Sequence, residues 1–146
     1  MYFEEFEEGK VLETRSRIIT GTDIDLFATL TGALNPVFLS DRVGMQRGYK
    51  GRVSPGILTF ATSVGLLYEL GFFDHLIALL EIKEVRFPAP VYPGDEIRCE
   101  VRVAEKRETK KEDRGIVVLR WECFNQDKIK VLEAGITIMV ERKPSS

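Results

Sequence analysis

The stretch Ser-Pro-Gly-Ile-Leu-Thr-Phe-Ala-Thr-Ser-Val-Gly-Leu-Leu-Tyr-Glu-Leu-Gly, residues 54–71, decides the fold, because it is long, apolar and carries only one charge, at Glu69. Ser54 suits the N-cap of a helix, Pro55 suits its first position, and Gly71 suits its end. Apolar side chains occur on nearly every side of this helix, which is typical of a helix inside a core. At about 25 Å it is too short, and too interrupted by hydroxyl residues, to span a membrane. The sequence therefore predicts one buried helix.

The part of the chain after this helix has the period-two alternation of antiparallel strands. Apolar and charged residues alternate without a break over residues 97–103, which indicates a strand with one buried and one wet face. The alternation over residues 79–91 slips once at Glu84, where we expect a β-bulge. The tract 105–114 mixes charges of both signs, as a solvated hairpin tip does. Four strands are predicted, over residues 79–91, 97–103, 115–124 and 129–140.

Shorter elements are expected before the long helix. Loose alternation predicts a strand at a sheet edge over residues 11–20. Thr22 can cap a short helix that Gly32 ends, and another helical turn or two is expected over residues 41–47. This order predicts an α+β, hot-dog arrangement in a single domain, residues 1–146, with one long buried helix wrapped by a curved antiparallel β-sheet. The open sheet edge and the helix's exposed side favour a homodimer.

The composition excludes several classes of function. The chain has 21 bases, 23 acids and a formal charge of −2, so a nucleic-acid surface is not expected. Its first residues are acidic where a signal peptide needs a basic and then an apolar region, and Cys99 and Cys123 lie in strand-like runs, so we expect a cytoplasmic protein with reduced cysteines and no membrane contact. One histidine, His75, and two cysteines without a short ligand spacing predict no metal, and no cofactor motif follows a strand.

Three segments carry a resemblance to a known family. Residues 27–41, 48–59 and 85–95, the last with its Pro-Gly-Asp turn, resemble the MaoC-like (R)-specific enoyl-CoA hydratase and 3-hydroxyacyl dehydratase family. The resemblance covers nearly the whole chain, from about residue 3 to residue 142. It implies a hot-dog fold, dimers, and acyl thioesters of coenzyme A or acyl carrier protein as ligands.

The same resemblance points to two missing catalytic side chains. In hydratases of this family an aspartate follows the helix-ending glycine, and a histidine stands two residues after the Asn-Pro pair. This sequence has Ala33 and Phe38 at those places, and Pro55 where the family has a further histidine. Methyl and benzyl groups carry no transferable proton, so the acid/base pair that hydration requires is absent from both expected positions.

The expected binding residues remain in place. Gly56 matches the family glycine whose backbone N–H contacts the thioester carbonyl, and Asn35 matches a residue that holds the preceding loop. Ser54 lies beside this N–H, but helix capping explains it better than a nucleophilic role, because no histidine neighbours it. A cluster of bases could meet the phosphates of coenzyme A or could be scattered surface charges, and the sequence leaves both interpretations open; it consists of Arg42, Arg47, Lys50 and Arg52.

Three hypotheses follow for the function. The first is a dimer that holds an acyl thioester of coenzyme A or acyl carrier protein without hydrating it, or the inactive partner of a catalytic hot-dog subunit. The second is an active hydratase, dehydratase or thioesterase whose base comes from elsewhere, such as Asp41 or a residue across the dimer. The third is a structural or regulatory protein that binds no ligand.

Overall fold

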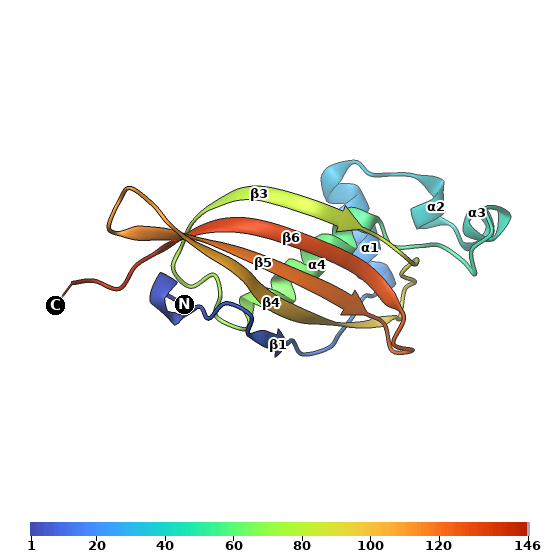
Figure 1. Ribbon diagram of the computed structural model, residues 1–146. Coiled ribbons are helices and arrows are strands. Elements are labelled where there is room, and N and C mark those ends of the chain that lie inside the picture. The colour runs from blue at the N-terminus through green and yellow to red at the C-terminus, as the bar shows by residue number, and fades with distance from the viewer. Residues whose placement is uncertain (146) are drawn as a thin grey trace.

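A computed structural model describes residues 1–145, in which a curved antiparallel sheet wraps around one long helix (Figure 1). The strands follow the order β1-β4-β5-β6-β3, and β2 pairs separately with β4. This confirms the predicted α+β arrangement. The elements are η1 (Phe3–Glu5), β1 (Val11–Glu13), β2 (Arg17–Ile18), α1 (Gly21–Thr31), α2 (Pro36–Leu39), α3 (Asp41–Gln46), α4 (Gly56–Tyr68), β3 (Leu76–Arg86), β4 (Glu96–Glu108), β5 (Arg114–Phe124) and β6 (Lys130–Glu141).

Helix α4 begins one residue later than predicted. Pro55 is its N-cap and has a ψ of 135°, which is extended, so the first helical residue is Gly56. Ser54 is therefore not the cap: its Oγ instead lies 3.2 Å from both the carbonyl oxygen of Pro55 and Oγ1 of Thr59. The helix ends at Tyr68, and Gly71, with a φ of 82°, closes a further turn.

One face of α4 is buried against the sheet and the other is exposed. Ser63 accepts a hydrogen bond of 2.9 Å from Nε1 of Trp121, which satisfies two polar groups inside the core. On the opposite face Ile57 is 63% exposed and Tyr68 is 52% exposed. The apolar composition of the helix predicted burial on nearly every side. In the single chain only one of its faces is buried.

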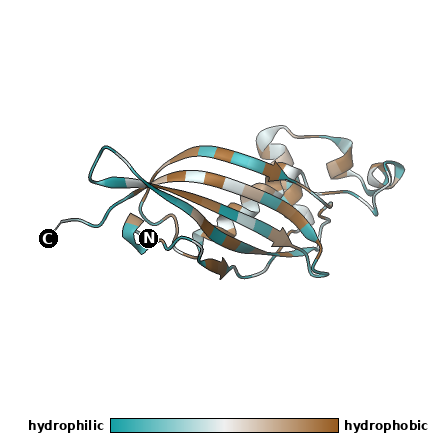
Figure 2. Cartoon of the chain, in the orientation of Figure 1, coloured by the Kyte–Doolittle hydropathy of each residue, from teal (hydrophilic) through white to brown (hydrophobic). Residues whose placement is uncertain are grey.

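The sheet confirms the alternation seen in the sequence. Inward residues of β4 and β5 are buried, and bands of high and low hydropathy alternate along the strands in Figure 2. Strand β3 begins at Leu76, earlier than predicted. It also ends earlier, at Arg86, because Pro88 and Pro90 follow it and cannot donate hydrogen bonds to a ladder. The bulge predicted at Glu84 is confirmed by its φ of 51° and by a register shift there.

The prediction of free cysteines is wrong. Cys99 and Cys123 are direct register partners on β4 and β5, both fully buried, and they form a disulfide. The sequence showed that both residues lie in strands. It did not show that the register places them opposite each other.

The N-terminal elements differ in detail from the prediction. The expected strand over residues 11–20 divides into β1 and β2, because Thr14 between them accepts a hydrogen bond through Oγ1 from the Cys99 N–H. Helix α1 is capped by Thr20, not Thr22, and Gly32 ends it with a φ of 79° as expected. None of the helices in residues 1–145 is long and apolar enough to cross a membrane.

Candidate functional site

Ala33 and Phe38, where the family resemblance leads us to expect an aspartate and a histidine, lie between α1 and α2 and on α2 itself. Gly32 ends α1, Ala33 follows it, and Asn35 caps α2 by accepting a 3.0 Å hydrogen bond from the N–H of Val37. Phe38 on α2 is half-buried and packs against the core. Asn35 therefore has a structural role, because it holds the start of α2. At the position where hydratases of the family have histidine, α2 carries the aromatic ring of Phe38.

The start of α4 lies next to this loop. The Val53 N–H donates to the carbonyl of Val37 at 3.1 Å, which fixes the segment before α4 beside α2. Thr59 is the first residue whose N–H bonds within the helix, to the carbonyl of Pro55, so the N–H of Gly56 has no partner in the helix. The positive end of the helix dipole adds to its ability to bind an oxyanion or a carbonyl oxygen.

Phe87 shapes the space around Gly56, and sequence analysis missed it. A Cβ atom at Gly56 would lie 3.1 Å from the Phe87 ring, tighter than most real Cβ contacts. Phe87 is itself 43% exposed. The ring comes from the segment after β3, so only the fold brings it to the helix N-terminus. Position 56 therefore favours a residue without a side chain, independently of any ligand.

The structure divides the four candidate bases into two kinds. The Arg52 guanidinium lies 2.7 Å from Asp25 on α1 and 3.5 Å from the carbonyl oxygen of Phe38, so it fastens α1 to the site loop. Arg42, Arg47 and Lys50 are exposed and have no ion-pair partner among residues 1–145. These three bases remain free to meet a ligand.

Asp41, the candidate alternative base, is part of the same framework. It is the first residue of α3, and its Oδ1 accepts a 3.0 Å hydrogen bond from the backbone N–H of Arg52. It also lines a cavity of about 550 Å³ together with Lys50, Tyr92 and Asp95. Asp95 accepts hydrogen bonds from the Tyr92 N–H and from Gln126, so this carboxylate is committed to the Pro-Gly-Asp turn.

An apolar cavity of about 250 Å³ lies between α4 and the sheet. It starts at Phe60, one turn into the helix, and reaches Tyr68 at its end, about 6 to 18 Å along the axis from Gly56. This cavity could not be predicted from the sequence, because apolar residues at helical spacing indicate a core equally well. Its lining residues are Phe60, Ala61, Val64, Tyr68, Phe73, Leu76, Leu79, Ile136 and Ile138.

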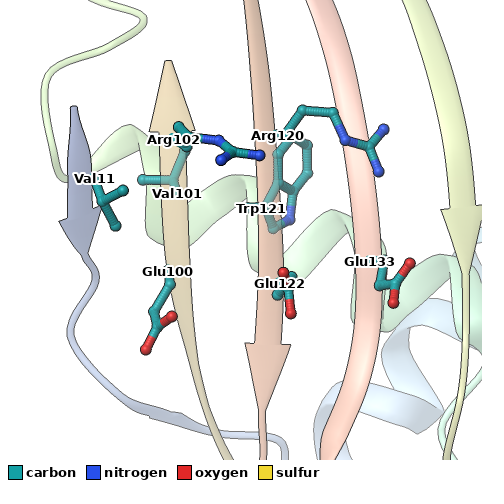
Figure 3. A pocket seen from close by; sticks show the side chains of 8 residues that line it. All are labelled: Val11, Glu100, Val101, Arg102, Arg120, Trp121, Glu122 and Glu133. Carbon is teal, nitrogen blue, oxygen red and sulfur yellow. The ribbon is translucent and has the colours of Figure 1, made fainter. Parts of the chain in front are cut away.

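A third cavity, of about 310 Å³, lies on the sheet face that turns away from α4 (Figure 3). The register places Glu100, Glu122 and Glu133 in one row across three strands. Lys130 lies 3.0 Å from Glu122 and 2.7 Å from Glu133, and its hydrogen bond lowers the pKa of Glu133. Lys130 thus pairs with two of these glutamates on the outer face of the sheet, and the sheet lies between this cavity and Gly56.

The fold and the helix terminus together define a class: hot-dog proteins with an unpartnered backbone N–H at the start of the central helix. The chain matches the MaoC like domain family over residues 3–121 and belongs to that family. It is 33% identical to the uncharacterized protein YdeM of Bacillus subtilis, over 97% of this chain and 100% of that protein. It is also 27% identical to the (R)-specific enoyl-CoA hydratase of Rhodospirillum rubrum, over 95% of this chain and 91% of the hydratase.

Solved structures agree with this assignment. A monoamine oxidase regulatory protein from Archaeoglobus fulgidus superposes with a TM-score of 0.90 and 29% identity, over 99% of this chain and 96% of that chain. A Mycobacterium tuberculosis protein described as a double hot-dog fold gives a TM-score of 0.88 at 18% identity, over 100% of this chain and 46% of its own. The predicted hot-dog fold is thereby confirmed.

Proposed function

We propose that this protein binds acyl thioesters, of coenzyme A or of acyl carrier protein, without hydrating them. The observation that carries the proposal is the unpartnered N–H of Gly56 beside a loop with Ala33 and Phe38 in the two positions where hydratases of the family have aspartate and histidine. The backbone N–H of Gly56 can bind a thioester carbonyl oxygen. The side chains of Ala33 and Phe38 can neither activate nor protonate water.

The neighbouring features fit each part of such a ligand. The carbonyl oxygen would accept from Gly56, and the acyl chain would extend along α4 into the apolar cavity that ends at Tyr68. Phe38 would fill space beside the carbonyl where the reacting water of a hydratase must stand. A thioester bound in this way has a polarised carbonyl but no nucleophile.

The proposal includes a homodimer. The exposed stripe of α4 continues into β3, an edge strand whose Leu79 and Ile82 are about half exposed. A long apolar edge strand in a monomer is an aggregation hazard, and pairing with a second copy removes it. A catalytic hot-dog subunit could take the place of that second copy.

A second candidate function is an active hydratase, dehydratase or thioesterase that uses Asp41 as its base. The observation in its favour is that Asp41 lines the 550 Å³ cavity. The Asp41→Asn variant separates the two candidates: an enzyme with this base loses its turnover, whereas a binding protein keeps the same ligand affinity.

The test of the first candidate compares two substitutions at Gly56. Gly56→Pro removes the N–H, and Pro55 already has the extended ψ that a following proline requires. Gly56→Ala keeps the N–H and places the same Cβ against Phe87, so it is the matched control. We expect the alanine variant to bind acyl-CoA about tenfold more tightly than the proline variant in calorimetry. Equal affinities in two folded variants would contradict the placement of the thioester.

A further inference from the structure

The segment between the site loop and α4 forms a surface of its own. The chain leaves the site at Phe38, makes the short helix α3, and returns to the site at Gly56. In Figure 1, α2 and α3 lie at the end of the molecule opposite the β4–β5 hairpin tip. Its exposed side, here called the α3 surface, consists of Arg42, Met45, Arg47, Tyr49 and Lys50.

The α3 surface differs in charge from the rest of the molecule. Residues 41–52 contain four bases and one acid, a net charge of +3, while the whole chain carries −2 and the remainder therefore −5. Arg52 and Asp41 are both bonded inside the fold. Arg42, Arg47 and Lys50 have no ion-pair partner in the part of the chain that the structure describes. Such a concentration of one sign attracts an anionic partner over several ångströms.

The shape of the region distinguishes between two kinds of anionic partner, a nucleotide phosphate and an acidic protein. A nucleotide phosphate needs a concave basic pocket, but the adjoining cavity contains the carboxylates of Asp41 and Asp95 beside Lys50 and Arg52. The free bases instead lie on an outer surface, together with Met45, which is 56% exposed, and Tyr49, which is 40% exposed. Arginine, methionine and tyrosine are among the residues that are enriched in protein–protein interfaces.

We propose that the α3 surface docks an acidic carrier protein, which delivers the acyl thioester to the Gly56 site on a flexible arm. This inference rests on the proposed function. Both ends of the segment that carries the surface are at the site, so a partner docked there holds its thioester next to Gly56. The bases would pair with carboxylates of the carrier, and the exposed methionine and tyrosine would pack on its apolar residues.

The experiment measures affinity for three ligands that share one acyl group: butyryl-pantetheine, butyryl-CoA and a butyryl-loaded acyl carrier protein. The variant is Arg42→Glu, Arg47→Glu, Lys50→Glu. Its control is Lys10→Glu, Lys110→Glu, Lys111→Glu, which changes the net charge equally at exposed, unpaired bases outside the α3 surface. Thermal unfolding of both variants verifies that each folds.

We expect the α3 variant to lose at least about tenfold in affinity for the loaded carrier at low salt, since charge steering alone changes association rates by that factor or more. Its affinity for butyryl-pantetheine and butyryl-CoA should stay within about twofold, and the control should bind all three as wild type does. An equal loss for butyryl-CoA, or an unchanged affinity for the carrier, would overturn the docking proposal alone. If wild type binds none of the three ligands, the proposed function fails and the docking proposal fails with it.

Discussion

The sheet with α4 and the region from α1 to α3 differ in what holds them. The first is held by continuous ladders of β4, β5 and β6 and by a core of fully buried side chains. The second is held by helix caps and by individual bonds such as Arg52 to Asp25, with most of its side chains exposed. Stability is therefore concentrated in the sheet and α4, while Ala33 and Phe38 lie in the region where substitutions cost less stability. With such a division, the residues at these two positions can change while the hot-dog fold stays intact.

The largest effect that this contrast predicts is at Trp121. Trp121→Ala leaves a cavity in the core and removes the donor to Ser63, so it should lower the free energy of unfolding by about 3 to 5 kcal/mol. Phe38→Ala, on the half-buried site loop, should cost clearly less. Urea unfolding of both variants measures the difference, and equal losses would contradict the division into two regions.

The disulfide should have the next largest effect. It joins residues 24 apart, a loop for which chain entropy predicts about 3 to 4 kcal/mol. The double variant Cys99→Ala, Cys123→Ala should therefore melt roughly 10 °C lower than the oxidised protein. Calorimetry with and without reductant provides the control, because reductant should shift the wild type and leave the double variant unchanged. A wild-type Tm insensitive to full reduction would count against this contribution.

Introducing the aspartate and the histidine that hydratases of the family have should change activity more than stability. The double substitution Ala33→Asp, Phe38→His should raise crotonyl-CoA hydration by at least about 100-fold over wild type, because the two groups act on one water. Each single substitution should have little effect, since groups that act as a unit are non-additive. A double variant that folds and binds but hydrates no faster would show that the surrounding residues no longer position the water.

The exposed face of α4 and β3 should determine the oligomeric state. Leu79→Glu places a charge in the apolar stripe and should convert the expected dimer to a monomer in light scattering. Val11→Glu, at the opposite sheet edge and similarly exposed, should leave the mass unchanged. Wild-type protein that is monomeric at micromolar concentration would rule out the dimer.

The smallest effect concerns pH. The Thr20 backbone N–H lowers the pKa of Asp23 in the capping box of α1. A carboxyl whose pKa is lower in the folded state stabilises the protein above its unfolded pKa, and that contribution is lost as pH falls through the folded value. Asp23→Asn should therefore flatten the acid side of the stability profile slightly. An acid limb identical to that of wild type would contradict the assignment.

The same contrast explains what the sequence could predict. Strand β4 followed from the uninterrupted alternation over residues 97–103, because one of its faces is buried. Helix starts were displaced by one or two residues. Thr20 and Thr22 can both cap a helix, and that Pro55 rather than Ser54 is the cap of α4 depends on its extended backbone angle. The contacts of Phe87 with Gly56 and of Arg52 with Asp25 join distant segments. No local pattern indicates such pairs.

The central claim is that this protein binds an acyl thioester without the acid/base pair for hydration. The most direct test measures crotonyl-CoA binding by calorimetry and crotonyl-CoA hydration by absorbance on the same wild-type sample. We predict saturable binding together with a turnover at least 100-fold below the roughly 10 per second of an ordinary enzyme. A turnover near 10 per second would contradict the claim and would show that another residue acts as the base.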